Sequence, residues 1–571
     1  MRITPLASPQ GRRIDPGEAD AEIARLEGAA VGAAGELDAL AARVTADGHP
    51  DEGAIFGAQA AMARDPALIA MAADHVGAGQ DAVGAVLAAG TDLADQLRAL
   101  GDEVLSARAA DVEDVAGRIA GRLAGDAVAC PTLHEPAIVV ASDLSPSATA
   151  TLPRERLLGL ALEAGSPTAH AAILARAYGI PAVVGVGGLL AGLDDLVTGP
   201  MTAGAAAGSG TLWIDGGAGE VVLEPDAATA ARLASRRLDA DRASETALAE
   251  AGLPAVTLDG TAVTLLANIG TPAEADRAVA LGAHGVGLFR TEFLFIERSQ
   301  PPTEEEQLSA YRSVVESFLP HPVTVRLLDV GGDKPIPYLA IPEEANPFLG
   351  VRALRLAPDR PDLFVTQLRA AMRAAAPLPD GRAPVVKVMA PMVADAGDAE
   401  LLLALAARAQ SELDAEGLPH GPVVLGVMLE IPGAVLVGDS YLDRLGFASL
   451  GTNDLLQYTL AVDRGNPALG RYQDSLHPAL LRLVREAVEA SARAGVELSV
   501  CGEMAGDPVA ALALAGLGIR NLSMASGSLA AVRRSIRGAD LATLERESAA
   551  ALDAPSAALV RRRFEGLAAP G

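Results

Sequence analysis

Cysteine, aromatic residues and lysine are scarce in this chain of 571 residues. Its two cysteines, Cys130 and Cys501, are far apart in the sequence and argue for a reducing compartment rather than a disulfide framework. Aromatic residues make up 3% of the chain, and only two of its 45 basic residues are lysines, Lys334 and Lys387. Arginine is therefore the usual cation, and each lysine marks either a need for a compact point charge or a chance escape from a bias in composition.

Long apolar runs and an excess of positive charge are also missing. The N-terminal residues lack the apolar segment of a secretory signal, and the Ala-rich stretches are interrupted by charges before the ~18 residues that a membrane span requires. The formal net charge of -28 argues against nucleic acid or an anionic membrane surface as a partner. We therefore expect a soluble cytoplasmic protein without a membrane insertion, in which any phosphate-binding groups are local.

The length of the chain and the change in residue pattern along it predict several domains, roughly three to four at about 150 residues each. Residues 1–125 have apolar residues at helical spacing and predict a helical bundle, whose acidic surface either docks a basic partner or is simply solvated. Short β-rich runs separated by Gly, Ser and Thr predict a compact α/β domain over 126–225. The charged stretch 226–253 predicts a helical linker.

The remaining residues, 254–571, repeat one pattern of an apolar strand, a polar loop and an amphipathic helix. Eight such units over somewhat more than the ~250 residues typical of the fold predict a (β/α)8 TIM barrel. The expected strands are 262–267, 285–289, 323–328, 384–391, 423–430, 447–451, 497–501 and 519–524. The fold class is therefore multidomain α/β, with an N-terminal helical bundle, an α/β domain and a C-terminal barrel.

A single histidine lies in the first turn of a short predicted helix. Thr168 is the expected N-cap of this helix, and Gly179 with Pro181 is the expected stop. Unpaired N–H groups and the dipole at the helix start favour an anion, so they would hold a phosphoryl group on His170. The same pattern also fits an ordinary surface or core histidine.

Charged and polar side chains follow the predicted strands at the end where a barrel of this type has its active site. They are Arg290 after the second strand, Arg326 and Asp329 at the third, Glu430 at the fifth, Asn453 and Asp454 after the sixth, and Cys501 at the seventh. Separate arginines can bind a phosphate and a carboxylate of one small molecule, and Glu430 and Asp454 offer the oxygen ligands that Mg²⁺ prefers. Each acid alone fits a salt-bridge partner, but their shared position predicts a phosphoryl-transfer site.

Six stretches of the chain read as motifs. They are Gly287–Phe295 (GLFRTEFLF), Arg326–Lys334 (RLLDVGGDK), Asn346–Arg352 (NPFLGVR), Glu430–Pro432 (EIP), Gly451–Asn466 (GTNDLLQYTLAVDRGN) and Cys501–Gly506 (CGEMAG). Together they resemble enzyme I of the bacterial phosphoenolpyruvate:sugar phosphotransferase system, over nearly the whole chain. Around the histidine, Ser166, Pro167 and Ala169 stand where that family often has Gly, Arg and Ser.

The resemblance implies a phosphoenolpyruvate-protein phosphotransferase, in which His170 of a swivelling domain takes phosphate from phosphoenolpyruvate and gives it to the carrier HPr, with release of pyruvate. It also implies roles for the barrel residues: Arg290, Arg326, Arg352, Asn453, Asp454 and Arg464 hold the substrate, Glu430 and Asp454 bind Mg²⁺, and Cys501 protonates the leaving enolate. It further implies a homodimer through the barrel and an N-terminal α/β domain whose helical-bundle insert docks HPr.

Two alternative functions stay open. A pyruvate phosphate dikinase or phosphoenolpyruvate synthase needs an ATP-binding module, whereas residues 1–125 are short, helical and without a Gly-rich phosphate loop followed by Lys. A regulatory protein that binds the carrier or phosphoenolpyruvate without turnover is the second alternative. The presence of His170, Glu430, Asp454 and Cys501 counts against it.

Overall fold

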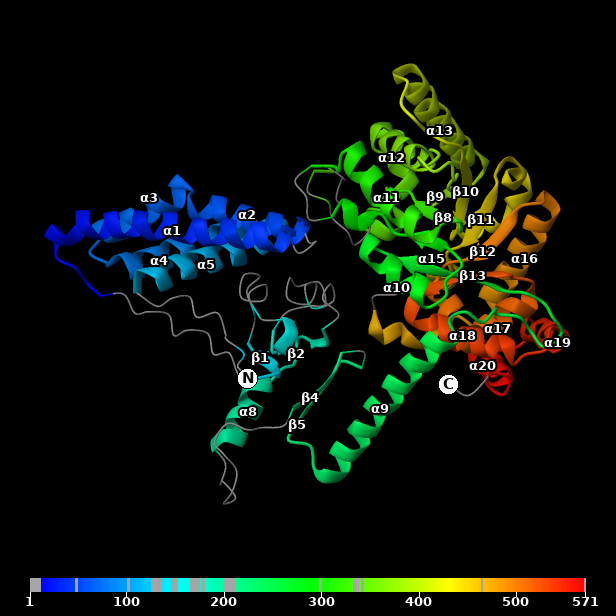
Figure 1. The fold of residues 1–571 in the computed structure, drawn as a ribbon, viewed down its shortest axis with the longest axis horizontal. Coiled ribbons are helices and arrows are strands. Elements are labelled where there is room, and N and C mark those ends of the chain that lie inside the picture. The colour runs from blue at the N-terminus through cyan, green and yellow to red at the C-terminus, as the bar shows by residue number, and fades with distance from the viewer. Residues whose placement is uncertain are drawn as a thin grey trace. The chain divides into compact units, whose positions relative to one another are not determined.

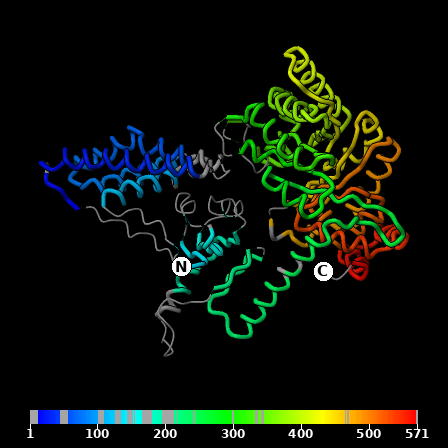
Figure 2. Tube along the Cα trace, viewed as in Figure 1, coloured from blue at the N-terminus to red at the C-terminus, as the bar shows by residue number. Residues whose placement is uncertain are grey.

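The structure is a computed structural model that divides into two compact units, Met1–Leu238 and Asp239–Gly571, and each unit is described by itself (Figures 1 and 2). The residues that it describes are 12–46, 50–99, 103–124, 133, 135–142, 144, 152, 154–164, 175, 180–198, 212–216, 218–296, 300–331, 336, 338–339, 344–463 and 466–568.

Helices make up the first part of the N-terminal unit, which confirms the predicted helical region. After a 3-10 turn at Pro16–Glu18 come α1 (Ala19–Ala46), α2 (Pro50–Ala63), α3 (Pro66–Gly77), α4 (Ala82–Ala99) and α5 (Glu103–Ala124). Small residues let these helices approach closely: a Cβ added at Gly90 of α4 would lie 2.4 Å from the Cβ of Ala116 on α5. Larger buried side chains such as Leu26, Phe56 and Ile119 fill the remaining core.

A small parallel sheet follows in the same unit. It has the order β1 (Ala137–Ala141), β2 (Leu157–Leu162), β3 (Ala182–Val183), with α8 (Leu189–Thr198) after it, and β4 (Leu212–Asp215) pairs antiparallel with β5 (Glu220–Leu223). We did not predict β4, because a four-residue strand after a Gly- and Ala-rich stretch shows little alternation. His170 and all of the helix predicted around it except Ala175 lie outside the described residues.

A long helix, α9 (Ala227–Ala249), occupies the stretch that was predicted as a helical linker. Its sequence is charged along most of its length, and Leu233 is one of its few buried side chains within the described part. The helix therefore has little apolar surface to bury.

Eight parallel strands form the closed barrel of the C-terminal unit, which confirms the predicted fold (Figure 1). They are β6 (Thr264–Ile269), β7 (Val286–Phe289), β8 (Val323–Arg326), β9 (Val386–Ala390), β10 (Val423–Leu429), β11 (Phe447–Leu450), β12 (Glu497–Val500) and β13 (Asn521–Ala525). Each strand pairs with the next along the chain, and β13 returns to β6, with Asn521 opposite Thr264. All carboxyl ends of the strands therefore lie at one end of the barrel.

Helices surround this barrel. They are α10 (Ala275–Ala280), α11 (Glu304–Phe318), α12 (Pro361–Ala374), α13 (Ala396–Glu416), α14 (Pro432–Leu436), α15 (Thr452–Leu460), α16 (Pro478–Ala494), α17 (Pro508–Leu517), α18 (Leu529–Arg537), α19 (Leu541–Ala551) and α20 (Ala557–Glu565). Clear local signals fix their ends: Asp507 accepts hydrogen bonds from the first turn of α17, and Gly518, with φ of 109°, ends it.

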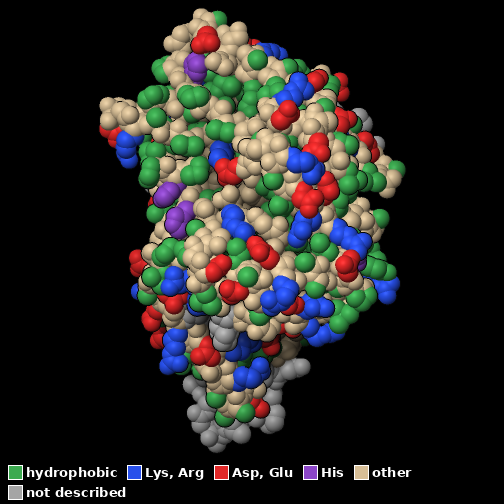
Figure 3. All heavy atoms as spheres, turned by 90° about the vertical axis from the view of Figure 1, so that its right-hand side faces the viewer, with side chains coloured by type: hydrophobic (Ala, Val, Ile, Leu, Met, Phe, Trp, Pro, Cys, Tyr) green, Lys and Arg blue, Asp and Glu red, His purple; other side chains and the backbone are tan. Residues whose placement is uncertain are grey.

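Most of the apolar core lies between the barrel and its helices, where Phe318, Phe364 and Phe564 are fully buried. A separate cluster inside the barrel contains Leu288, Met389, Met428, Phe447 and Cys501. Acidic and basic side chains are interspersed on the face shown in Figure 3. Among the described helices, none combines the length and the apolar character that a membrane span requires.

Candidate active site

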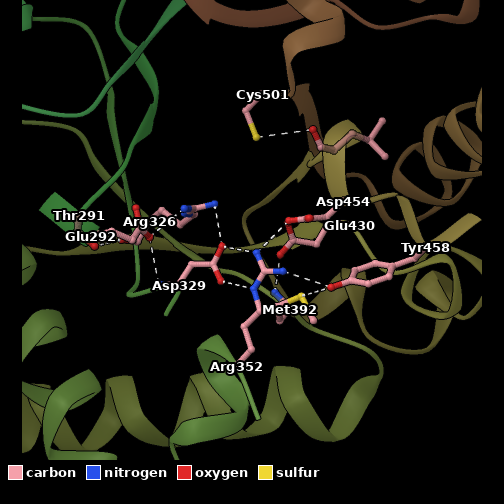
Figure 4. Close-up of polar contacts among 11 residues, drawn as sticks. Thr291, Glu292, Arg326, Asp329, Arg352, Met392, Glu430, Asp454, Tyr458 and Cys501 are labelled. Carbon is pink, nitrogen blue, oxygen red and sulfur yellow. Dashed lines mark hydrogen bonds and ion pairs between the residues drawn. The ribbon is translucent and has the colours of Figure 1, made fainter. Parts of the chain in front are cut away.

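The carboxyl ends of four barrel strands carry four of the predicted site residues. Arg326 is the last residue of β8, Glu430 and Cys501 directly follow β10 and β12, and Asp454 lies in the first turn of α15, after β11. Because the strands are parallel, these side chains meet at one mouth of the barrel (Figure 4).

Arg352 lies at the centre of a buried network at this mouth (Figure 4). Its Nε and Nη2 donate to the two carboxylate oxygens of Asp329 at 2.8 and 3.0 Å, and Nη2 also donates to Asp454 Oδ2 at 3.1 Å. Its Nη1 donates to the hydroxyl of Tyr458 at 3.3 Å. Burial alone would lower the pKa of Arg352, but the Asp329, Asp454 and Glu430 carboxylates more than offset this, so its pKa lies above the ordinary value. The guanidinium is thus charged and fixed in one orientation.

Arg326 is held in a similar way by acids on either side. Its Nη2 donates to Glu292 Oε1 at 2.8 Å, and its Nη1 lies 3.3 Å from Asp329 Oδ2. The same Glu292 oxygen accepts the backbone N–H of Asp329 at 3.0 Å. Burial opposes the charge on Arg326, but Glu292, Asp329 and Glu430 raise its pKa above the ordinary value. Glu292 therefore aligns both Arg326 and the loop that carries Asp329.

Glu430 is a buried acid among other acids, with only 1% of its surface exposed. Burial, followed by the negative charges of Asp454 and Asp329, raises its pKa to about 8. Its Oε1 accepts the backbone N–H of Met392 at 2.6 Å. Met392 has φ of 57°, a left-handed conformation that a residue with a side chain rarely adopts, and such backbone strain is common at functional sites.

The predicted metal ligands fit a magnesium site by their chemistry. Glu430 and Asp454 follow the neighbouring strands β10 and β11 and present oxygen ligands, and the repulsion between their carboxylates is what a cation would relieve. Across the described residues, no group of three or more His, Cys, Asp and Glu side chains gathers as a ready metal site. Mg²⁺ does not require one, because it usually takes one or two carboxylates and completes its octahedron with water and substrate phosphate.

Cys501 faces the mouth from an apolar surrounding. Only 2% of its surface is exposed, and its Sγ donates to the carbonyl of Leu450 at 3.6 Å. Burial raises the pKa of the thiol to about 11. At neutral pH the group is therefore a protonated thiol, which can give a proton but is a poor nucleophile.

The other predicted site residues are less closely involved or fall outside the described part. Arg290 directly follows β7, and Asn453 Oδ1 accepts the backbone N–H of Glu503 at 2.9 Å. Within the described residues, neither side chain is bonded to the Arg352 network. His170 and Arg464 lie outside the described residues.

Two residues of the network had no predicted role. Glu292 is the second residue after Arg290, and an acid within three residues of a predicted strand was the available signal. Tyr458 lies four residues after Asp454 on α15, so the two share one face of that helix. Its hydroxyl donates to the carbonyl of Phe348 at 2.6 Å and supports the loop that carries Arg352.

Comparisons with known proteins agree along the length of the chain. Family models match residues 2–108 as the N-terminal domain of a PEP-utilising enzyme, 133–219 as its mobile domain and 244–541 as its PEP-binding domain. The last match alone covers more than half of the chain.

Similar proteins carry two kinds of name. A phosphoenolpyruvate-protein phosphotransferase of Streptomyces coelicolor is 42% identical over 97% of this chain and 93% of its own length. A protein of the same name from Geobacillus stearothermophilus is 38% identical over 93% of this chain and 89% of its own length. A multiphosphoryl transfer protein of Rhodobacter capsulatus is 41% identical over 92% of this chain, which spans only 61% of that relative.

Proposed function

Because this chain belongs to the PEP-utilising enzymes, we propose that it is a phosphoenolpyruvate-protein phosphotransferase. It transfers the phosphoryl group of phosphoenolpyruvate to His170 and then to a histidine of the carrier protein HPr, and it releases pyruvate as the first step of a sugar phosphotransferase system. The observation that carries this proposal is the fixed pair of arginines, Arg326 and Arg352, beside Glu430 and Asp454 at the mouth of the barrel.

The substrate brings a phosphate and a carboxylate, and the arginines supply the opposite charge. Arg326 and Arg352 are buried, permanently charged and already oriented by their acid partners. Together with Arg290, Asn453 and Arg464 they would hold both ends of phosphoenolpyruvate, so little reorganisation is needed when charge redistributes in the transition state. Glu430 and Asp454 would hold Mg²⁺, which when bound neutralises charge on the transferring phosphoryl group.

The transfer itself makes one bond and breaks another. A ring nitrogen of neutral His170 attacks phosphorus, and the bond between phosphorus and the enol oxygen breaks, leaving the enolate of pyruvate. The Cys501 thiol then gives its proton to the methylene carbon of the enolate, and solvent returns a proton to the sulfur. The raised pKa of Cys501, about 11, keeps that proton in place until the enolate appears.

His170 must meet two different partners, so we also propose a division of labour along the chain. Residues 1–125 dock HPr, 126–225 carry His170, 226–253 act as the connector and 254–571 bind phosphoenolpyruvate and form a homodimer. The histidine has to come almost into contact with phosphorus in the first step and has to be exposed to a protein in the second. A helical connector such as α9 suits such a movement.

Labelling the full chain with phosphoenolpyruvate that carries radioactive phosphorus tests this proposal. We expect an acid-labile, base-stable label that requires Mg²⁺, does not require ATP, is absent from His170→Ala and passes to added HPr. A requirement for ATP would point instead to a pyruvate phosphate dikinase or phosphoenolpyruvate synthase. Binding of phosphoenolpyruvate without label or pyruvate would point to a regulatory docking protein.

A further inference from the structure

A cavity lies at the opposite end of the barrel from the mouth. It has a volume of about 280 Å³ and is lined by residues from the amino ends of the strands and the turns before them. These include Thr264, Val286, Phe447 and Asn521, which are the first residues of β6, β7, β11 and β13. In barrels of this kind that end usually serves stability alone, so an open space there calls for an explanation.

Three polar side chains on the wall of this cavity make no hydrogen bond within the part of the chain that the structure describes. Thr324 has only 5% of its surface exposed, yet its hydroxyl forms no hydrogen bond with any residue that the structure describes. The side chains of His321 and Asn521 likewise make none within the described part of the chain, whereas the His284 imidazole bonds to the backbone of Leu265. Because His321 is exposed and Asn521 is half-buried, these polar groups are open to water or to a ligand in the cavity.

The charged groups around the cavity favour an anion. Lys387 Nζ donates to Glu497 Oε2 at 2.7 Å and lies 5.1 Å from the centre of the Phe447 ring, which leaves further N–H donors of the ammonium for a ligand. The side chain of Glu497 is 45% exposed and can turn toward solvent, whereas that of Lys387 is 13% exposed. Lys387 is one of only two lysines in the chain, and the site at the mouth gives it no role.

The electrostatic environment of His284 also favours an anion in the cavity. The rings of His284 and His321 lie edge to face with their centres 5.8 Å apart. Burial, then His321 and then the fully buried Arg533 lower the pKa of His284 below its ordinary value. An anion in the cavity would offset the effect of the Arg533 charge.

We propose that this cavity binds a small organic carboxylate whose body is a single ring or a short branched chain. Lys387 and the imidazoles receive the carboxylate, and Leu266, Val286 and Phe447 surround the apolar body. A space of about 280 Å³ is close to the smallest ligand pockets and suits one ring rather than a nucleotide or sugar phosphate. This site is separate from the proposed function and stands without it.

The apolar cluster inside the barrel separates the cavity from the mouth. Phe447 lines the cavity and belongs to the same buried cluster as Cys501. Thr324 and Arg326 are two residues apart on β8, as Ser499 on β12 is from Cys501, so each pair shares one side of its strand. Phosphoenolpyruvate at the mouth and a carboxylate in the cavity should therefore not compete for space.

Equilibrium dialysis of the full chain with radiolabelled benzoate tests the site. We expect one saturable benzoate per chain, little binding of the neutral benzamide and no displacement by excess phosphoenolpyruvate with Mg²⁺. Lys387→Met should weaken benzoate binding about tenfold, since a hydrogen bond to a charged group is lost. Arg408→Met, which removes a cation paired with Glu412 on the outer helix α13, is the matched control and should bind as the parent does.

Two further variants make smaller changes and keep the proposal testable if Lys387→Met does not fold. Glu497→Gln frees Lys387 and should tighten benzoate binding, and Thr324→Val removes only the hydroxyl and should weaken it. Displacement of benzoate by phosphoenolpyruvate, or equal binding of benzamide and benzoate, would overturn the proposal. So would the absence of saturable binding at about 10 mM, where even a weak ligand of this size should occupy a fitting cavity.

Discussion

The two ends of the barrel differ in how their charged side chains are paired. At the carboxyl ends of the strands, Arg326 and Arg352 each contact at least two acids, and these side chains are almost fully buried. At the amino ends, Lys387 has a single acid partner, and the neighbouring side chains of Thr324 and Asn521 make no hydrogen bond among the described residues. Strands β8 and β12 contribute to both ends.

The difference is explained by the cost of burying charge. A buried ion left without a partner destabilises a protein by several kcal/mol, so the mouth can be prepared for a highly charged substrate only if its own charges hold one another in place. Neutral hydroxyl, amide and imidazole groups can be left to water at a much smaller cost. The mouth is thus preorganised for one substrate, and the amino end suits weaker binding of a smaller anion.

The largest effect on activity should come from removing one acid from the mouth of the barrel. In Glu430→Gln or Asp454→Asn, labelling of His170 by phosphoenolpyruvate should fall by at least roughly a thousandfold, because the proposed Mg²⁺ ligand and the charge balance are lost together. Labelling by phospho-HPr should change less than about twofold, because that half-reaction uses no barrel residue. Glu305→Gln, an exposed acid of α11, is the matched control. Equal loss of both half-reactions in a folded variant would refute the assignment.

Changing the thiol should have the next largest effect. Cys501→Ala should slow pyruvate formation roughly a hundredfold, because a proton donor acts in the transition state, while phosphoenolpyruvate binding should weaken less than about threefold. Cys130→Ala provides the control for loss of a thiol. Formation of pyruvate at the parental rate in Cys501→Ala would show that Cys501 has a purely structural role in the apolar cluster.

A residue that acts through another should have a smaller effect. Glu292→Gln keeps an oxygen for Arg326 but removes the charge, so Arg326 should be less firmly oriented and KM for phosphoenolpyruvate should rise roughly tenfold with a smaller change in kcat. Steady-state kinetics of pyruvate release measure this split. A fall in kcat alone would contradict a positioning role, and a lower melting temperature with unchanged kinetics would show that Glu292 serves stability.

The barrel could be predicted from the sequence because its signal is local. Each strand is an apolar run between Gly-, Pro- or Asp-containing turns, and the predicted and observed strand ends agree within two residues. The positions of Arg326, Glu430 and Asp454 followed directly, since a residue at the end of a parallel strand must lie at the mouth.

Sequence patterns could not predict the side-chain contacts between distant segments. Nothing in the sequence pairs Glu292 with Arg326 or Arg352 with Asp329, because each pair joins different loops and forms only when the barrel closes. The cavity is harder still, since its wall is assembled from the starts of strands as distant as Thr264 and Asn521. The roles of His170 and Arg464 stay predictions.

The smallest effect is expected at the amino end, as a change in how stability depends on pH. The pKa of His284 is lowered from its ordinary value of 6.5, first by burial and then by His321 and Arg533. The unfolded chain therefore takes up this proton more readily than the folded chain. The contribution to stability is complete above about pH 6.5 and is lost as the pH falls through the lowered pKa of the folded state.

Urea unfolding between about pH 7 and pH 5 can detect this contribution. In His284→Asn the free energy of unfolding should fall less steeply with decreasing pH than in the parent. Saturating benzoate should flatten the slope of the parent as well, because a carboxylate beside Lys387 would stabilise the protonated imidazole. An unchanged slope in His284→Asn would mean that the positive surroundings of the cavity are screened by water, and the contrast between the two ends of the barrel would then rest on pairing alone.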